Sequence, residues 1–480
     1  MPLKPTTKAQ VDGHRFLTRR ARHAVVSRDV RMLHDPLKRQ ATGLTVGVIA
    51  AVVGVAGAAV LALLDPAPDV NSTPIMMGRD SGQLYVRAGD RVHPVHNLAS
   101  ARLVLGEAAE PETVRDSDIA STPRGGLLGI PGAPSALPGH RDAEAAAAVS
   151  WTVCDEVLDA DRGRPRLLGT SVVAREGVGP GRETGPEEVM LVEVGGAGWL
   201  LRDGTRAKID LADTDLLTIL GVDGVDPRPV SAALIDPLPE LAPVARPQID
   251  LLGEPVDYGL DGLRIGQVFT VATATGPQTF VALADGVQEV GPVLGDVIRS
   301  TSTVGEVARV APDRMGVPRS VALDTGAYPR TRPEVVATVD SPVLCVRESA
   351  GQDAPARRVS IVAGATGPGP DEARPVAGAD GAGPAVDAVG VPGGGLVVVA
   401  AGRGTTTRGA VTTVLADTGV RFDVPDAETA AILGLGGTPV PVDGAILDRL
   451  PAGPRLDRSA ALVTHDGSEL HAVGAEGAAG

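Results

Sequence analysis

Aromatic residues and lysine are scarce in this chain of 480 residues. It has two Trp, three Tyr and four Phe, so its cores must be built from small aliphatic side chains. Lysine occurs only at Lys4, Lys8, Lys38 and Lys208, and no Gly-Lys pair exists. A P-loop needs Gly-Lys followed by Ser or Thr, and the chain also lacks a complete G-x-G-x-x-G pattern. These absences exclude the common phosphate-binding loops.

Catalytic and metal-binding signatures are also missing. His93 and His96 are close in sequence, but no cysteine or further histidine accompanies them, as a zinc site would require. No G-x-S-x-G nucleophile elbow occurs. The sequence predicts no catalytic residue, no cofactor-binding residue and no metal ligand, and it gives no support to an enzyme.

Cysteine is limited to Cys154 and Cys345. Each lies in a short apolar run, residues 151–154 and 343–346, of the kind that forms a buried strand. Both follow the long apolar stretch described next, in the compartment where disulfides persist. We expect one bridge between distant parts of the chain; two separate buried thiols are the alternative.

One long apolar stretch lies between Ala41 and Leu64, with no charged side chain until Asp65. At about 1.5 Å per residue, 24 residues make a helix of roughly 36 Å, enough to cross a hydrocarbon core of about 30 Å. A buried core helix and a cleaved signal peptide, with 56–58 as its cleavage site, are the alternatives. The length and the charged leader favour a membrane-spanning signal anchor.

Charge differs on the two sides of this stretch. Residues 1–40 carry ten Lys/Arg against three Asp/Glu, a net charge of +7, so the rest must sum to −22 given the total of −15. The positive-inside rule places 1–40 in the cytoplasm and 65–480 outside. The acidic body argues against nucleic-acid binding, whereas the basic arm suits anionic membrane lipid. The arm could form a short amphipathic helix or a solvated flexible segment.

Four stretches beyond the anchor share a pattern: a short apolar strand, a turn with glycine and a second strand. This pattern predicts β-hairpins. A short helix with a polar cap and a closing glycine follows three of them, and the third copy is looser. The hairpins are expected at 82–95, 198–209, 278–290 and 411–425, and the helices at 97–106, 213–221, 292–297 and 425–434.

The two cysteine segments lie between the first and second hairpins and between the third and fourth. The predicted fold is a single-pass membrane protein with an α+β, β-rich outer domain. In it, four hairpin-plus-helix repeats surround a disulfide-closed central β domain with pseudo-two-fold symmetry. Residues 364–391 and the tail after Arg455 are expected to be mobile. The predicted parts are a basic arm 1–40, a transmembrane helix 41–64, repeat 1 at 65–125, the first central half 126–185, repeat 2 at 186–255, repeat 3 at 256–330, the second central half 331–400, repeat 4 at 401–456 and a flexible tail 457–480.

Several segments resemble the EccB family, a membrane component of mycobacterial and actinobacterial type VII secretion systems. They are residues 13–16 with Arg19 and Arg20, 30–36, 78–86, 97–103, 128–134 and 151–155. The resemblance implies an inner-membrane protein with a cytoplasmic N-terminus and a periplasmic domain. It also implies self-association, assembly with EccC, EccD, EccE and the mycosin protease, and an attributed ATP hydrolysis. The residues expected to contact cytoplasmic partners are Arg15, Phe16, Arg19, Arg20 and Arg31.

The resulting functional prediction is a structural subunit that organises the periplasmic part of the secretion complex. The alternatives are an anchored module that binds cell wall or substrate, an extracytoplasmic hydrolase, and an ATP-hydrolysing subunit of the same complex.

Overall fold

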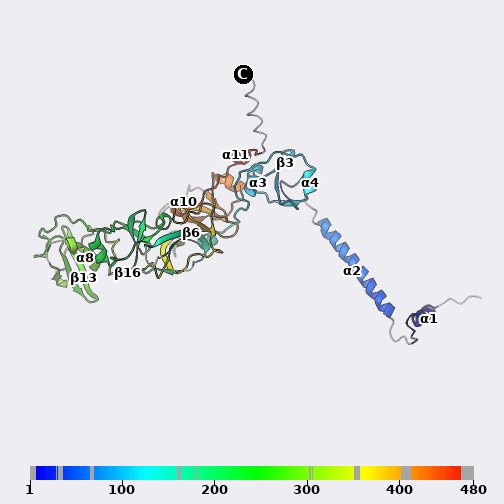
Figure 1. Ribbon diagram of the computed structural model, residues 1–480, viewed down its shortest axis with the longest axis horizontal. Helices are drawn as coiled ribbons and strands as arrows, with labels where there is room; N and C mark the ends of the chain where they lie inside the picture. The colour runs from blue at the N-terminus through cyan, green and yellow to red at the C-terminus, as the bar shows by residue number, and fades with distance from the viewer. Residues whose placement is uncertain are drawn as a thin grey trace, which may run out of the picture. The chain divides into compact units, whose positions relative to one another are not determined.

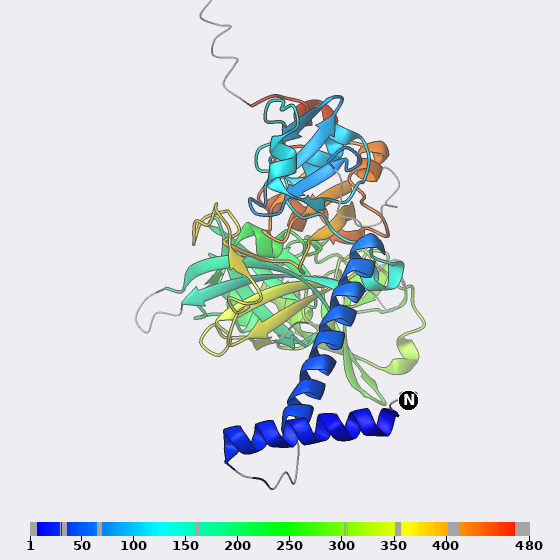
Figure 2. The same ribbon diagram turned by 90° about the vertical axis from the view of Figure 1, so that its right-hand side faces the viewer.

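The computed structural model divides the chain into two compact units, Met1–Ser72 and Thr73–Gly480. The first unit contains α1 (Lys8–Ser27) and α2 (Pro36–Leu64), each drawn as one uninterrupted helix (Figures 1 and 2). The residues that the structure describes are 7–28, 30, 36–64, 70–158, 164–177, 179, 181–301, 304, 306–350, 357–401 and 412–465.

Local sequence explains the ends of both helices. The backbone N–H of Thr7 donates to the Gln10 side chain at 3.0 Å, which satisfies a free donor at the start of α1. Helix α1 ends at Ser27, and the C-cap residue Arg28 adopts a left-handed conformation with φ 53°. Pro36 stands at the first position of α2, where its missing N–H costs no hydrogen bond.

The second unit contains five sheets within the described residues, and four of them share one strand order. Each of these sheets begins with the outer strand of a hairpin, followed by the hairpin's inner strand and then by the strand that comes before the hairpin in sequence. The fourth strand comes later in the chain and runs parallel to the strand that precedes the hairpin. The sheets are β3-β2-β1-β4 (β1 Ile75–Gly78, β2 Leu84–Ala88, β3 Arg91–Pro94, β4 Glu112–Val114), β10-β9-β8-β11 (β8 Glu188–Val194, β9 Ala197–Arg202, β10 Thr205–Lys208, β11 Arg228–Pro229), β14-β13-β12-β15 (β12 Val268–Thr273, β13 Gly276–Leu283, β14 Gly286–Glu289, β15 Ala308–Val310) and β23-β22-β21-β24 (β21 Leu396–Ala401, β22 Thr412–Leu415, β23 Arg421–Val424, β24 Val440–Asp443). We call them sheets 1 to 4 in chain order.

A proline carbonyl contacts the same outer strand in all four sheets. One strand residue donates its N–H to the proline oxygen and accepts a hydrogen bond from the residue two positions beyond that proline. A proline has no N–H of its own, so it fits this edge position, where only its carbonyl is needed. The donor and proline pairs are Val92 with Pro123, Arg206 with Pro239, Val287 with Pro318 and Arg421 with Pro451, at 2.8–2.9 Å.

The fifth sheet is the central one, with the order β19-β20-β6-β5-β17-β18-β7. Its two middle strands come from distant parts of the chain and pair antiparallel, with Cys154 opposite Cys345. The strands of the central sheet are β5 (Val149–Leu158), β6 (Arg166–Glu176), β7 (Arg182–Glu183), β17 (Val343–Ala350), β18 (Arg357–Gly364), β19 (Arg374–Pro375) and β20 (Ala388–Gly390). A further short strand, β16 (Glu334–Val335), pairs with β8 of sheet 2.

A helix follows each of the four hairpins. In α3 the Asn97 side chain accepts from Ser100 N–H, and Gly106 ends the helix in the left-handed conformation. The third helix, α8, is longer than the sequence suggested, at 11 residues. These helices are α3 (Leu98–Leu105), α6 (Thr214–Leu220), α8 (Gly291–Thr301) and α9 (Ala427–Ile432); the other short ones are α4 (Asp116–Ala120), α5 (Ala143–Ala147), α7 (Ala232–Ile235), α10 (Gly444–Arg449), α11 (Arg458–Ala461) and the 3-10 turn η1 (Pro312–Arg314).

The buried apolar clusters give the order in which the sheets pack. Sheets 1 and 4 share one cluster, which includes Ile75 and Phe422. Sheets 2 and 4 both pack into the cluster of the central sheet, around Trp151. Sheets 2 and 3 share a third cluster, which includes Leu191 and Leu294. Within the second unit the order of neighbours is therefore sheet 1, sheet 4, central sheet, sheet 2, sheet 3, as Figure 1 shows from α3 to α8.

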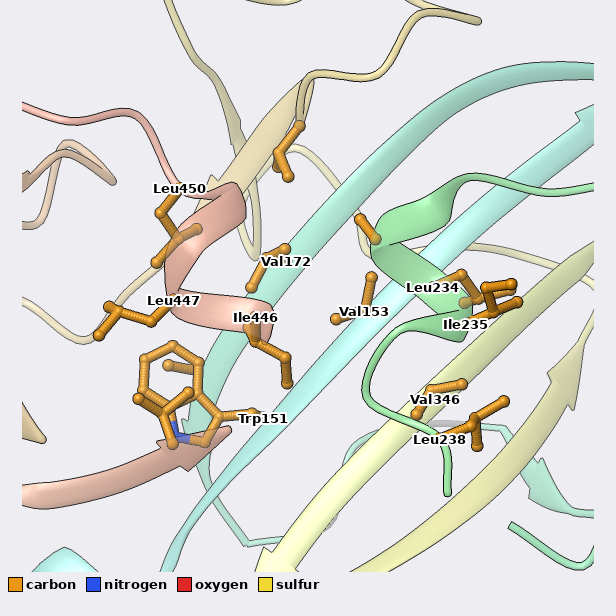
Figure 3. Packing of buried hydrophobic residues seen from close by; sticks show 14 of the residues in the cluster. Trp151, Val153, Val172, Leu234, Ile235, Leu238, Val346, Ile446, Leu447 and Leu450 are labelled. Atoms are coloured by element: carbon orange, nitrogen blue, oxygen red, sulfur yellow. The ribbon is translucent and has the colours of Figure 1, made fainter. Parts of the chain in front are cut away.

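Helices α7 and α10 cover one face of the central sheet. Leu234 and Ile235 of α7 and Ile446 and Leu447 of α10 pack over Trp151 and its neighbours (Figure 3). At about 25 cal/mol per Å² of apolar area, each fully buried aliphatic side chain stabilises the fold by roughly 1.5–3 kcal/mol. These two helices therefore share one buried core with the central sheet and with sheets 2 and 4.

The expected hairpins are present in all four sheets. Two expectations of disorder need correction. The stretch 364–391 contains β19 and β20, because β20 gains a parallel partner in β6. Residues 457–465 of the predicted flexible tail contain α11, because Leu456 and Ala461 are buried in the cluster that sheets 1 and 4 share. The rest of that tail lies outside the described residues. Strand β21 also begins at Leu396, before the expected start of repeat 4 at 401.

Candidate assembly sites: membrane helix, basic arm and bridged core

The membrane anchor predicted between Ala41 and Leu64 falls within α2. Its segment Ala41–Val60 has a mean hydropathy of 2.2 and no buried side chains. Among the described residues it is the one helix long and apolar enough to cross a membrane. A helix satisfies its own backbone hydrogen bonds, so this segment can enter lipid without further partners.

The basic arm forms α1, which carries four of the five predicted contact residues. Arg15 and Arg19 are four positions apart and therefore share a face with Arg22, while Leu17 and Ala21 lie on the opposite side. Phe16 is 52% exposed, so its ring has no core to pack into. The predicted contact residues on α1 are Arg15, Phe16, Arg19 and Arg20; Arg31 lies outside the described residues.

The two cysteines form a disulfide across the centre of the second unit. Cys154 of β5 and Cys345 of β17 are directly paired in the sheet, with their Cα atoms 4.0 Å apart. They lie 191 residues apart in sequence, and Val343 and Val362 pack against the sulfurs in a small apolar cluster. The bridge therefore joins two halves of the sheet that no short connection links.

A buried carboxylate, Asp155, follows the bridged Cys154 in strand β5. Asp155 accepts hydrogen bonds from Ser231 N–H at 2.6 Å, Ser231 Oγ at 2.9 Å and Thr170 Oγ1 at 2.7 Å. Burial raises the pKa of Asp155 to about 6, although these hydrogen bonds and the charge of Arg228 act in the opposite direction. Because Ser231 is the N-cap of α7, Asp155 holds the start of that helix against β5.

A second buried carboxylate plays a similar part at α10. Glu348 of β17 accepts from the N–H of Asp443, the N-cap of α10, at 3.0 Å. It also pairs with Arg357 at 2.6 Å. Burial raises the pKa of Glu348, while the charge of Arg357 lowers it. Each helix that covers the central sheet thus starts at a carboxylate from one of the two middle strands.

The structure gives no clustered metal ligands among the residues that it describes, where no group of three His, Cys, Asp or Glu could hold an ion. His93 contacts the carbonyl of Gly126 through Nδ1 at 3.0 Å. His96 instead meets the ring of His465 edge-on, with centroids 5.3 Å apart. The two histidines that are close in sequence therefore have different surroundings.

Sequence reasoning missed Asp155, Glu348 and their roles at the helix starts. A signal for Asp155 was present, because a carboxylate directly after the apolar run 151–154 must be hydrogen-bonded if the strand is buried. Its partner Ser231 is 76 positions away, so the pairing needed the fold.

Within the part of the chain that the structure describes, one apolar helix followed by a β-rich domain with a disulfide-bridged core fits the class of single-pass membrane proteins. The family model described as "Type VII secretion system ESX-1, transport TM domain B" matches residues 3–469. The chain therefore belongs to the EccB family of type VII secretion components.

Curated relatives and solved structures agree with this assignment. "ESX-1 secretion system ATPase EccB1" of Mycobacterium tuberculosis (H37Rv) is 36% identical over 485 residues, which cover 97% of this chain and 96% of that protein. "ESX-3 secretion system ATPase EccB3" of the same strain is 33% identical over 491 residues, which cover 96% and 90%.

Among solved structures, a chain of the intact ESX-5 inner membrane complex has a TM-score of 0.70 and 32% identity, with 97% of both chains covered. The EccB3 dimer from the ESX-3 core complex has a TM-score of 0.71 and 33% identity, which covers 82% of this chain and 100% of that one.

Proposed function

We propose that this chain is a structural subunit of a type VII secretion membrane complex and organises the part of the complex outside the cytoplasm. The observation that carries the proposal is the match of 97% of the chain to a subunit of the intact ESX-5 inner membrane complex. Because the match extends over both the membrane helix and the bridged domain, the whole chain, not one module, is built for such an assembly.

The proposed orientation places α1 in the cytoplasm and the second unit in the periplasm. Its support is the charge difference between residues 1–40, at +7, and the acidic remainder. On this proposal α2, between Ala41 and Leu64, anchors the chain in membrane lipid. Helix α1 offers Arg15, Phe16, Arg19 and Arg20, with Arg31 after it, to EccC or EccD at the inner face.

The proposed outer domain consists of four repeats around the central sheet with pseudo-two-fold symmetry. Three observations support it: the common strand order of sheets 1 to 4, the same proline contact in each, and a packing order with two sheets on either side of the centre. Each half would contribute two repeats and one middle strand. Such a duplicated body offers equivalent surfaces for self-association, which a relative shows as a dimer.

Proposed partners are EccC, EccD, EccE and the mycosin protease, and the test is co-purification. A tagged full-length chain, extracted from native membranes in mild detergent, should bring down these proteins in one large complex. A chain that repeatedly purifies alone, while the other components still purify together, would overturn the proposal in favour of an anchored module that binds cell wall or substrate.

A second candidate is an ATP-hydrolysing subunit, because the curated relatives carry "ATPase" in their names. The chain has no Gly-Lys pair, so it cannot form the usual P-loop. ATP turnover by the purified full-length chain, measured free of EccC-type ATPases, distinguishes the two: turnover that follows the chain through every column supports the enzyme.

A further inference from the structure

The disulfide faces a small, partly open cavity. Val153 and Val346 pack toward α7 and α10, so their neighbours Cys154 and Cys345 lie on the opposite face of the central sheet. The cavity over the sulfurs has a volume of about 30 Å³. Its walls include Arg175, Arg347 and Glu372, and the segment 366–368 forms part of its cover.

A larger groove adjoins this cavity. It has a volume of about 460 Å³ and is lined by β6 and by residues 390–392. Arg175 and Glu372 line both the groove and the cavity. Their ion pair, at 2.7 Å between nitrogen and oxygen, therefore stands between the two spaces. Both side chains are more than a third exposed, so the pair can separate into water at small cost.

The segment that carries Glu372 approaches the sheet closely at one point. Glu372 N–H donates to Gly369 O at 2.9 Å, which closes a short turn. That turn lies on Gly390, where a Cβ atom would collide with the carbonyl oxygen of Glu372. Glycine at 390 thus lets the turn rest against the sheet and sets the Glu372 side chain beside Arg175.

We propose that the Cys154–Cys345 disulfide is a reducible cross-link, reached by the thiolate of an external dithiol through the groove when the Arg175–Glu372 pair opens. The positive charge of the cavity walls suits this chemistry. In thiol–disulfide exchange the attacking group and the leaving group are both thiolates. The positive charge of arginine side chains attracts the attacking thiolate and stabilises the leaving one. Arg347 is almost fully buried and carries this positive charge to the cavity wall.

The exchange balances with the dithiol as the only reductant. Its thiolate attacks one cysteine sulfur, a mixed disulfide forms, the Cys154–Cys345 bond breaks and the other cysteine leaves as a thiolate. The second thiolate of the reductant then attacks the mixed disulfide. The reductant ends as a disulfide, and the two electrons and two protons that it gives up convert Cys154 and Cys345 to thiols.

The test measures the rate of disulfide reduction in the folded, full-length chain in detergent, by alkylation of the released thiols and mass spectrometry. Glu372→Gln keeps a side chain of the same size but removes the ion pair, so reduction should be roughly two- to fivefold faster. Glu176→Gln is the matched control, because Glu176 lines the groove but not the cavity and pairs with Arg141. The rate of disulfide reduction in this variant should equal that in the unchanged chain.

A second measurement compares two thiols. At equal concentrations of thiolate, an anionic thiol such as mercaptoethanesulfonate should reduce the bridge faster than the cationic thiol cysteamine, and Arg175→Gln should narrow that difference. Rates that rise linearly with thiol concentration support attack on the folded chain. A rate that is independent of thiol concentration, matches global unfolding and is the same for both glutamate variants would overturn the proposal.

Discussion

Asp155 accepts two hydrogen bonds from Ser231, one from the backbone N–H at 2.6 Å and one from Oγ at 2.9 Å. This pair joins the middle of the central sheet to the helix that follows sheet 2. The carboxylate is fully buried, next in sequence to a bridged cysteine. Its protonation should therefore change the stability of the whole second unit.

We predict that Asp155 makes the chain more stable in mild acid. The pKa of Asp155 is raised from 3.8 to about 6, so the folded chain binds a proton more tightly than the unfolded chain. The resulting stabilisation is complete below pH 3.8 and is lost as the pH rises through about 6. A pKa difference of this size between the folded and unfolded chains corresponds to roughly 3 kcal/mol.

Asp155→Asn should remove this dependence. Because other groups titrate as well, the quantity to measure is the difference in unfolding free energy between the two chains from about pH 4 to about pH 7. The unchanged chain should lose stability relative to the variant as the pH rises. A difference that stays constant across this range, or that has the opposite slope, would contradict the assignment.

Loss of the disulfide should destabilise the second unit. Cys154→Ser opens a loop of 191 residues, for which the chain-entropy model gives about 5 kcal/mol and measured cases about 2–5 kcal/mol. Thermal unfolding under oxidising conditions measures the loss. Addition of a reductant should lower the melting temperature of the unchanged chain and leave that of the variant unaltered. If the unchanged chain melts at the same temperature with and without reductant, the bridge contributes nothing to the stability of the second unit.

The sequence was most informative where structure depends on near neighbours. Asp203 and Gly204 both have positive φ, 45° and 67°, as the tight turn between β9 and β10 requires, and the glycine pattern identified that hairpin. Asn97 and Gly106 marked the ends of α3 in the same way. Such features depend on residues within about ten positions of one another.

What the sequence did not reveal depends on distant pairing. Strand β20, in a glycine-rich stretch expected to be mobile, pairs in parallel with residues Ser171 to Val173, more than 200 positions earlier. The parallel fourth strand of each of sheets 1 to 4 was likewise missed. Such a strand can be as short as two residues, as Arg228–Pro229 is in sheet 2. Such short strands carry no periodicity of their own and exist only because a partner strand is already in place.

Trp151 should contribute through its ring nitrogen as well as its size. Its Nε1 donates to the carbonyl of Pro441 in β24 at 3.1 Å and so ties the central sheet to sheet 4. Trp151→Phe keeps most of the buried ring but leaves that carbonyl without its donor, at an expected loss of about 1–3 kcal/mol. Chemical denaturation measures it. A loss of about 3–5 kcal/mol, typical of Trp→Ala, would mean that packing and not the hydrogen bond dominates.

The arm helix should act through charge. Replacing Arg15, Arg19 and Arg22 together by Gln removes one basic face of α1 without shortening the helix, because glutamine has nearly the helix propensity of arginine. We expect weaker retention of the cytoplasmic partners in the co-purification, with an unchanged melting temperature of the second unit. Retention of the cytoplasmic partners equal to that of the unchanged chain would contradict a role for this basic face.

Orientation can be tested with two single cysteines, because both native cysteines are bridged. Val26 in α1 and Val321 in the second unit are 83% and 89% exposed, so Val26→Cys and Val321→Cys should disturb neither fold. A thiol reagent that cannot cross membranes, added to intact spheroplasts, should label Val321→Cys at once and Val26→Cys only after lysis. The charge of +7 on residues 1–40 makes transfer of that arm across the membrane unfavourable. Labelling in the reverse order would place the acidic domain in the cytoplasm, and the chain could then not organise the periplasmic part of the complex.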